Sequence, residues 1–292
     1  MQNFNPNPCI ETHVVENLEE KIRLQEYGVN IFQSIQSKSA LKKILKRELI
    51  TLDGEIAKTS NWIENGQVLK LYAEEIEQEK KVFRLQLDVL YEDDFLAVIH
   101  KPSGYPTNGN YFKTIENALP YNLKQSSEKD KLPFPQPVHR LDNPTSGILL
   151  ISKTLSAKSL LSVLFENREI QKKYSAIVEG SLVTEQGEIN TDINGKRSLT
   201  RFNVKRVLQK EDKHFSLVDL WPDTGRTHQL RIHLSSKGNP IVGDAIYGVK
   251  SKKNSLLLHA SSLEFLHPKT HKRLFIETEL PHKFVKFMDG LM

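Results

Sequence analysis

Short strand-like runs without a regular helix between them dominate residues 85–292. Continuous or alternating apolar side chains mark such runs at 147–152 and 173–178. A doubly wound α/β fold needs a helix after almost every strand, because parallel neighbours require a crossover connection. Helical spacing is clear only at 155–167 and 226–237. The pattern therefore predicts an α+β domain with a mostly antiparallel, curved β-sheet.

A separate basic segment precedes this domain. Residues 37–50 place apolar side chains at helical spacing, with Ser39 as a possible cap, and cations cover the remaining helix surface. Those cations are Lys38, Lys42, Lys43, Lys46 and Arg47, and the last four are the ones that we expect to contact a phosphate backbone. Asp53-Gly54, between short apolar stretches, is typical of a tight hairpin turn. The segment predicts a small α/β domain, residues 28–75, that presents its cations to a phosphate backbone, although a solvated helix on a structural domain leaves the same pattern.

The predicted organisation has two further parts, an N-terminal extension at residues 1–27 and a charged linker at residues 76–84. With 38% hydrophobic and 26% charged residues among 292, the chain is not collagen-like, mucin-like or wholly disordered. The single cysteine, Cys9, cannot close an intramolecular disulfide, and we find no export signal and no apolar stretch long enough for a membrane span. We therefore expect a cytoplasmic protein with no membrane partner. A monomer is our default expectation, since the sequence does not determine the oligomeric state. The net charge of +5 is compatible with a polyanionic partner but does not require one.

A dense cluster of polar side chains lies directly before the buried run at 147–152. His139, Arg140 and Asp142 fall within four residues there, and the turn signal Asn143-Pro144 follows them. A neighbouring arginine favours the ionised form of an aspartate, which suits a nucleophile or a base. From spacing alone a plainer interpretation stays open, in which Asp142 caps the turn and Arg140 forms a surface ion pair.

A second polar cluster opens the helix that we expect over residues 226–237. Arg226 and Arg231 lie in its first turns, where free backbone N–H groups also attract anions. Thr227 and His228 stand between them. Arginine keeps its charge at every physiological pH, so this arrangement suits contacts to phosphate or carboxylate groups.

No motif for a metal or an organic cofactor accompanies these clusters. The histidines that could be considered as metal ligands are His139, His228, His233 and His259. They form no HExxH pattern and have no cysteine ligand set beside them, so we expect no metal site. The sequence also lacks a GxxxxGK[ST] phosphate loop, a strand-to-helix GxGxxG and a GxSxG nucleophile elbow. A carboxylate pair of glycoside-hydrolase type stays open on spacing, although only Asp142 stands in an arginine-rich setting.

Five ordered blocks between residues 90 and 260 share the motifs of one enzyme family. They are LYEDDFLAVIHKPSGYP at 90–106, HRLDNPTSG at 139–147, KYSAIV at 173–178, TGRTHQLRIHLSSKGNPIVGDAIYG at 224–248 and LLLHA at 256–260. Through these blocks the chain resembles the RluA-type RNA pseudouridine synthases, whose HRLD run carries the catalytic aspartate. The basic segment separately resembles the RNA-binding domain of small-subunit ribosomal protein four, which is often found ahead of this catalytic domain.

The resemblance implies the pseudouridine synthase fold and the isomerisation of uridine to pseudouridine within RNA. It implies that Asp142 is the essential carboxylate and that Arg231 is its salt-bridge partner. It also implies that Tyr174 stacks on the flipped uracil and can assist proton movement at C5 of the base. Arg140 is implied to fill the gap that the flipped base leaves. The residues implied to contact RNA, or to brace the loop that does, are His139, Arg140, Arg226, Thr227 and His228.

The implied reaction involves no redox change and no external nucleophile, so we expect neither a metal nor an organic cofactor. The expected partner is RNA, with ribosomal RNA favoured by the added basic domain and transfer RNA as a further possibility. Two alternatives remain: a catalytically silent RNA-binding protein of the same fold, and a metal-dependent nuclease. The joint presence of Asp142, Tyr174 and Arg231 argues against the silent protein.

Overall fold

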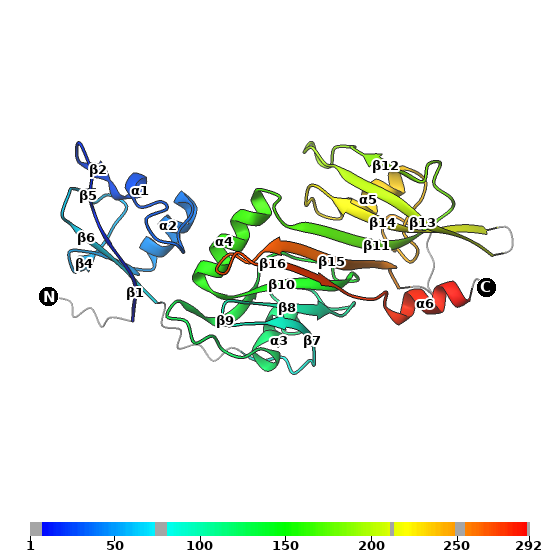
Figure 1. The fold of residues 1–292 in the computed structure, drawn as a ribbon, viewed down its shortest axis with the longest axis horizontal. Coiled ribbons are helices and arrows are strands. Elements are labelled where there is room, and N and C mark those ends of the chain that lie inside the picture. Colours follow the sequence, from blue (N-terminus) through cyan, green and yellow to red (C-terminus); the bar gives the residue numbers. More distant parts are fainter. Residues whose placement is uncertain (1–7, 74–80, 211–212, 249–254, 291–292) are drawn as a thin grey trace.

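The structure, a computed structural model, describes residues 8–73, 81–210, 213–248 and 255–290. These residues form a small N-terminal unit and a large unit built on one long sheet (Figure 1). The small unit has its own cluster of buried apolar side chains, and the large unit has four such clusters. No helix in the described parts of the chain combines the length and the apolar character needed to cross a membrane.

The small unit contains a four-stranded antiparallel sheet, a separate strand pair and two helices. In sheet order its strands are β1 (Cys9–Val14), β6 (Val68–Tyr72), β3 (Ile50–Leu52) and β4 (Glu55–Ile56), and the pair is β2 (Ile22–Arg23) with β5 (Trp62–Ile63). The helices are α1 (Leu24–Tyr27) and α2 (Lys38–Lys46). The predicted turn at Asp53-Gly54 joins β3 to β4.

This unit begins earlier in the chain than the sequence predicted. β1 pairs along β6, and Val15 and Leu24 are buried in the small core. The prediction of a separate extension over residues 1–27 is therefore wrong for the described residues 8–27. β1 was missed because its side chains are exposed or half-buried without a strict alternation, and because its partner strand lies far along the chain.

Helix α2 has an apolar face towards the small core and a basic face towards solvent. Ser37, rather than Ser39, caps it, since the Ser37 side-chain oxygen accepts a hydrogen bond of 3.2 Å from the N–H of Ala40. Leu41 and Leu45 are buried in the core. The predicted cations Lys38, Lys42, Lys43, Lys46 and Arg47 are all exposed, and Lys38 forms an ion pair with Glu26.

The large unit is built on a ten-stranded sheet. In sheet order its main path runs through β12 (Gln186–Ile189), β13 (Thr200–Lys210), β14 (Lys213–Pro222), β11 (Gln171–Glu179), β15 (Leu258–Leu266), β10 (Ser146–Thr154), β8 (Leu96–Lys101) and β7 (Asp88–Glu92). β16 (Arg273–Glu277) pairs with β15, and β9 (Lys131–Pro137) pairs with β10. Every pairing except β10 with β15 is antiparallel, so the predicted α+β class is confirmed.

Helices cover this sheet at several places (Figure 1). They are α3 (Ile115–Asn122), α4 (Leu155–Glu166), α5 (Gln229–Ser236) and α6 (His282–Asp289). α3 shares a core cluster with Ile99 and α4 shares one with Val98, so these two helices cover opposite faces of β8. α5 packs through Leu230 onto the β11 and β14 side of the sheet.

The large unit also begins before residue 85. Within the predicted linker, 76–84, residues 76–80 lie outside the described part of the chain. Phe83 packs on the core cluster that contains Leu119, and its N–H donates to the carbonyl of Asn117 at 2.9 Å. The predicted linker is therefore too long at its C-terminal end.

The parallel contact between β10 and β15 joins the two halves of the sheet. It consists of two residue pairs, Ser146 with His259 and Gly147 with Ala260. Gly147 has a φ of +124°, and a Cβ atom there would lie 2.3 Å from the carbonyl oxygen of Ala260. Across β15, Tyr174 of β11 also pairs with Ala260. This seam therefore sets the separation between β10, which follows the Asp142 loop, and the strand that carries Tyr174.

Candidate active site

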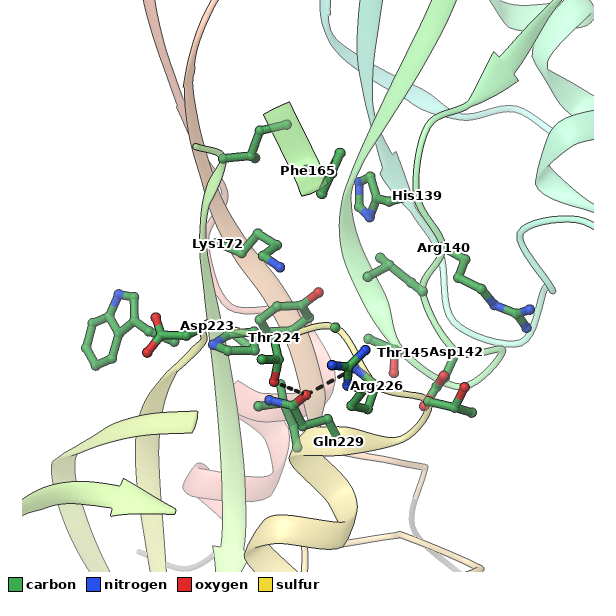
Figure 2. A pocket seen from close by; sticks show the side chains of 18 of the residues that line it. His139, Arg140, Asp142, Thr145, Phe165, Lys172, Asp223, Thr224, Arg226 and Gln229 are labelled. Atoms are coloured by element: carbon green, nitrogen blue, oxygen red, sulfur yellow. Dashed lines mark hydrogen bonds between the residues drawn. The ribbon is translucent and has the colours of Figure 1, made fainter. Parts of the chain in front are cut away.

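A cavity of about 570 Å³ lies in the large unit, within the range of small-molecule sites. Most of its wall residues belong to the segments 138–145, 165–174 and 221–231, and Arg201 and Leu258 complete the wall. Figure 2 shows side chains from these segments around a common space. Asp142, Tyr174 and Arg231 come from three different segments and all line the cavity. The structure therefore brings together the three residues that the resemblance assigns to chemistry.

Asp142 and Arg231 form an ion pair at the cavity wall. The Asp142 carboxylate accepts a hydrogen bond of 3.2 Å from Nη1 of Arg231. The same guanidinium binds Asp244 through Nε at 2.7 Å and Nη2 at 2.8 Å. The side chains of Arg231 and Asp244 are 4% and 0% exposed, whereas that of Asp142 is 21% exposed. A buried cation thus holds the Asp142 carboxylate while leaving part of it accessible.

Opposing effects act on the charge of Arg231. Burial alone would lower its pKa, but the hydrogen bonds to Asp244 and Asp142 raise the pKa above its usual value. For Asp244, burial alone would raise the pKa. Hydrogen bonds from Arg231 and from the N–H groups of Tyr247 and Ile246 instead bring that pKa below its usual value. These hydrogen bonds therefore favour the charged forms of both Arg231 and Asp244.

His228 and Tyr247 complete the surroundings of this pair. Tyr247 places its ring centroid 5.2 Å from Cζ of Arg231, and its hydroxyl lies 3.0 Å from Nδ1 of His228. Nε2 of His228 lies 3.7 Å from Asp142. His228 has a left-handed backbone, with φ 57° and ψ 20°, which is uncommon for a residue other than glycine. α5 begins after this conformation, at Gln229, and so later than the sequence predicted.

Gln229 stabilises the turn that precedes α5. Its side-chain carbonyl accepts hydrogen bonds from the hydroxyl of Thr224 at 2.6 Å and the N–H of Arg226 at 3.0 Å. Arg226 and Thr227 therefore lie in a turn, and not in the first turn of the helix as predicted. The guanidinium of Arg226 donates to the carbonyl of Arg197 at 3.2 Å, and Thr227 is exposed at the cavity.

A fully buried lysine holds the backbone that follows Asp142. Lys101 donates from Nζ to the carbonyls of Pro102 at 3.0 Å, Asn143 at 3.1 Å and Thr145 at 2.7 Å. Burial lowers the pKa of Lys101 to about 7, and the negative charge of Asp142 opposes that shift. Lys101 is therefore a positioning residue for the Asp142 loop.

The residue before Asp142 is fixed just as firmly. The hydroxyl of Thr107 donates to the carbonyl of Leu141 at 3.0 Å and accepts from its N–H at 3.2 Å. Both residues are buried, and Leu141 shares a core cluster with Tyr174. Backbone contacts on each side thus restrict where the Asp142 carboxylate can lie.

Tyr174 enters the cavity from the start of β11. Burial, and next the negative charge of Asp142, raise the pKa of Tyr174 well above its usual value. The side chain is therefore a neutral phenol at physiological pH. A flat aromatic ring with a hydroxyl group can stack on a planar base and donate a hydrogen bond.

The two residues at the start of the HRLD run have different surroundings. Nε2 of His139 accepts a hydrogen bond of 3.0 Å from the N–H of Leu150, and its ring centroid lies 4.9 Å from that of Phe165. Burial, and next the charge of Lys172, lower the pKa of His139 to about 3. This neutral ring suits bracing of the loop rather than binding of phosphate. Arg140 is exposed at the cavity.

The remaining predicted residues lie apart from this cavity. The basic side chains of α2 belong to the small unit and do not line it. His233 bonds with Thr200 at 2.9 Å, and His259 lies 3.0 Å from the hydroxyl groups of both Ser146 and Thr278. Over residues 8–73, 81–210, 213–248 and 255–290, no group of three or more His, Cys, Asp or Glu side chains could hold a metal ion.

Sequence reasoning did not single out several residues that shape the site. They are Lys101, Thr107, Lys172, Asp244 and Tyr247. Lys101, Asp244 and Tyr247 lie inside blocks that carry the family resemblance, which was the available signal. Their importance follows from burial and from partners distant in sequence, neither of which a local pattern contains.

Comparisons with known proteins show which family this chain is similar to. Residues 95–236 match a family model described as RNA pseudouridylate synthase. An uncharacterized RNA pseudouridine synthase of Aquifex aeolicus (strain VF5) is 32% identical over 294 residues, which cover 91% of this chain and 92% of that protein. Ribosomal large subunit pseudouridine synthase D of Pseudomonas aeruginosa is 31% identical, with 90% of each chain covered. The solved structure of human RNA pseudouridylate synthase domain containing 1 is similar with a TM-score of 0.58 and 26% identity, over 70% of this chain and 87% of that one.

Proposed function

Because the chain belongs to the RNA pseudouridine synthase family, we propose that it isomerises specific uridines of structured RNA in the cavity that holds Asp142. One observation carries the proposal. The partly exposed Asp142 carboxylate lies 3.2 Å from a buried Arg231, in a cavity that Tyr174 also lines. An anion, a fixed cation and a flat neutral ring are the groups that this reaction requires.

The reaction rearranges bonds within one nucleotide. The bond between N1 of uracil and C1′ of ribose breaks, the uracil turns, and its C5 bonds to C1′. C5 loses a proton and N1 carries one in the product, so the overall change is an isomerisation. Asp142 either attacks C1′ or removes a ribose proton, and both steps need an ionised carboxylate.

Arg231 meets that need through charge and orientation. Arg231 donates a hydrogen bond that orients the Asp142 carboxylate, and Asp244 fixes the guanidinium in place with two hydrogen bonds. Lys101 fixes the backbone after Asp142. A preorganised site of this kind lowers the barrier, since little reorganisation is needed when charge develops.

Tyr174 is assigned to the uracil while it is detached from its sugar. Stacking on the ring would hold the base near C1′ during its turn. Because the pKa of Tyr174 is raised, the residue acts as a plate and a hydrogen-bond donor and not as a base at neutral pH.

The target base must leave its helical stack before it reaches this cavity. Extruding a nucleotide costs a few kcal/mol and least where pairing is already weak, which favours uridines in loops or strained stems. We assign Arg140 to the gap that the base leaves. Arg226, Thr227 and His228 are assigned to the phosphate backbone, and His139 to bracing the loop.

Ribosomal RNA is the substrate class that we favour. Relatives from Zymomonas mobilis and Pseudomonas aeruginosa are named as ribosomal large subunit pseudouridine synthases. The exposed cations of α2 are suited to grip an additional part of a large folded RNA. Transfer RNA is the competing substrate, and a cytoplasmic monomer stays a prediction.

Release of tritium tests the proposed reaction directly. RNA transcribed with uridine labelled at C5 should lose label to water when the wild-type protein acts on it. The Asp142→Asn variant should bind the same RNA and release no label. Binding without release by the wild-type protein would instead support the silent RNA-binding alternative.

Mapping of pseudouridine identifies the substrate. Total RNA from cells with and without the intact gene should differ at one or a few positions in ribosomal RNA. A difference confined to transfer RNA would contradict the favoured substrate while leaving the reaction intact. Absence of any difference, together with no release of tritium, would contradict both.

A further inference from the structure

The cavity extends beyond Asp142 to a second group of charged side chains that the proposed chemistry does not use. Lys172 precedes Tyr174 on β11, and both residues line the cavity. In Figure 2 the amino group of Lys172 points into the space between β11 and the segment that carries His139. Lys172 thus faces the same space as the catalytic residues from a position farther along the strand.

The ammonium group of Lys172 is left without an acceptor. No residue in the described parts of the chain forms a hydrogen bond or an ion pair with it, and the centroid of the Phe165 ring lies 5.8 Å from its Nζ. The negative charge that acts on it most is that of Asp223. Arg201 already binds that carboxylate, through Nε at 3.2 Å and Nη2 at 3.0 Å.

Among the described residues the ammonium group contacts the Phe165 ring but has no hydrogen-bond acceptor, and a half-buried cation in such surroundings is costly to maintain. Burial lowers the pKa of Lys172, and the charge of Arg168 adds to this effect. An anion that enters the cavity would therefore stabilise the ammonium form of Lys172.

The surrounding charges also favour an incoming anion. The cavity wall carries more cations than carboxylates: Arg140, Arg168, Lys172, Arg201, Arg226 and Arg231 against Asp142, Glu166 and Asp223. The cations therefore exceed the carboxylates by three. Arg226 is held by a neutral carbonyl, so its charge is not cancelled.

We propose that Lys172 binds a backbone phosphate of the RNA strand next to the uridine held at Asp142. This inference rests on the proposed function, since an RNA strand that delivers a nucleotide to Asp142 brings phosphodiester groups with it. A phosphodiester is ionised at every physiological pH and offers oxygen acceptors to the three N–H donors of the ammonium group. Lys172 is a binding residue in this assignment and takes no part in bond breaking.

Lys173 provides a matched control within the same strand. It follows Lys172 directly, does not line the cavity, and binds Glu277 with Nζ at 2.5 Å from the carboxylate. Removing its charge therefore disturbs a surface ion pair and leaves the cavity unchanged. Lys172→Met and Lys173→Met remove the same charge at positions one residue apart.

The salt dependence of RNA binding distinguishes these variants. The probe is a transcript of bacterial large-subunit ribosomal RNA, bound by the full chain over a series of salt concentrations. Lys172→Met should weaken binding about tenfold at low salt, as expected for removal of a charge-assisted hydrogen bond. The slope of log K against log salt should become shallower by about 0.7, the value for one phosphate bound on a single strand. Lys173→Met should keep the wild-type slope, and Lys172→Arg should restore it.

Each other outcome contradicts a specific statement. An unchanged slope with weakened binding would show that Lys172 contacts a neutral group such as a uracil carbonyl, and would overturn the phosphate assignment. An unchanged affinity would overturn it as well. If Lys172→Met shows the expected slope change but the wild-type protein releases no tritium from the transcript, only the proposed reaction is contradicted. A wild-type protein that does not bind the transcript would overturn both.

Discussion

Helices α2 and α5 are both short and both carry cations, but they place them in opposite surroundings. On α2 the cations are exposed while Leu41 and Leu45 fill the small core. On α5 the cation Arg231 is buried between the carboxylates of Asp142 and Asp244. An exposed cation contributes to affinity for a polyanion, whereas a buried one is committed to orienting another charged group. Under the proposed function, the same residue class would serve binding in one unit and chemistry in the other.

The largest effect should come from the anion that Arg231 orients. Asp142→Asn removes the carboxylate that acts in the chemical step, so turnover should fall by at least about 10³-fold. RNA affinity should stay within about 1 kcal/mol of the wild type, because Asp142 does not grip phosphate. Tritium release and filter binding measure the two quantities. Substantial product from this variant would contradict a chemical role for the Asp142 carboxylate that Arg231 of α5 orients.

A smaller effect should follow when the support of Arg231 is weakened. Asp244→Asn leaves the buried guanidinium with one carboxylate, so the free energy of unfolding should fall by about 3 kcal/mol. Turnover should fall by about 10²-fold, since Arg231 can then shift away from Asp142. Urea titration and single-turnover kinetics check these values, with Arg231→Lys as a variant that keeps the charge but cannot form the paired hydrogen bonds. Wild-type kinetics in both variants would mean that Arg231 serves stability alone.

Removing exposed cations should change binding and leave chemistry intact. The triple variant Lys42→Gln, Lys43→Gln, Lys46→Gln should bind RNA about tenfold more weakly at physiological salt. Its salt slope should become shallower by about 0.7 for each phosphate that the variant no longer binds. The rate at saturating RNA should equal that of the wild type. If the affinity and the slope do not change, the basic face of α2 does not bind RNA and is only a solvated surface.

The smallest effect concerns acid and a buried histidine. Burial, and next the charge of His100, lower the pKa of fully buried His259 to about 3. The unfolded chain therefore takes up this proton first as the pH falls below about 6.5, and the stability that the neutral ring contributes is lost between about pH 6.5 and pH 3. As the pH falls over that range, the unfolding free energy of the wild type should decrease more steeply than that of His259→Gln. The difference between the two should be about 1 kcal/mol per pH unit. Urea titrations at pH 7 and pH 5 compare the slopes, and equal slopes in the two proteins would contradict the assignment.

Much of the fold could be predicted because long strands and amphipathic helices leave local patterns. The apolar run at 147–152 became part of β10, and the helical spacing at 155–167 became α4. β1 left no such pattern, since it is stabilised by pairing with β6 at the far end of the small unit. The start of α5 was misplaced because the side chain of Gln229 stabilises a turn where free helical N–H groups were expected.

The residues of the candidate site also differ in how far they could be predicted from the sequence. Spacing alone left Asp142 open to a turn-capping role, and only the family resemblance connected it with Tyr174 and Arg231. The structure brings these three together, while their roles in the reaction stay proposals. Lys101 could not be predicted as a support of the Asp142 loop, because its acceptors are backbone carbonyls that lie close only after β8 and β10 have paired.

Gly147 makes the two halves of the catalytic unit mutually dependent. Its partner Ala260 also pairs with Tyr174, so one short stretch of backbone is shared by the strands on which the anion and the aromatic ring depend. A single added methyl group would meet the Ala260 carbonyl at 2.3 Å and push that shared stretch aside. The reactive atoms would all still be there, but out of alignment with one another. The residue at position 147 therefore affects the alignment of the site although its own side chain supplies no reactive group.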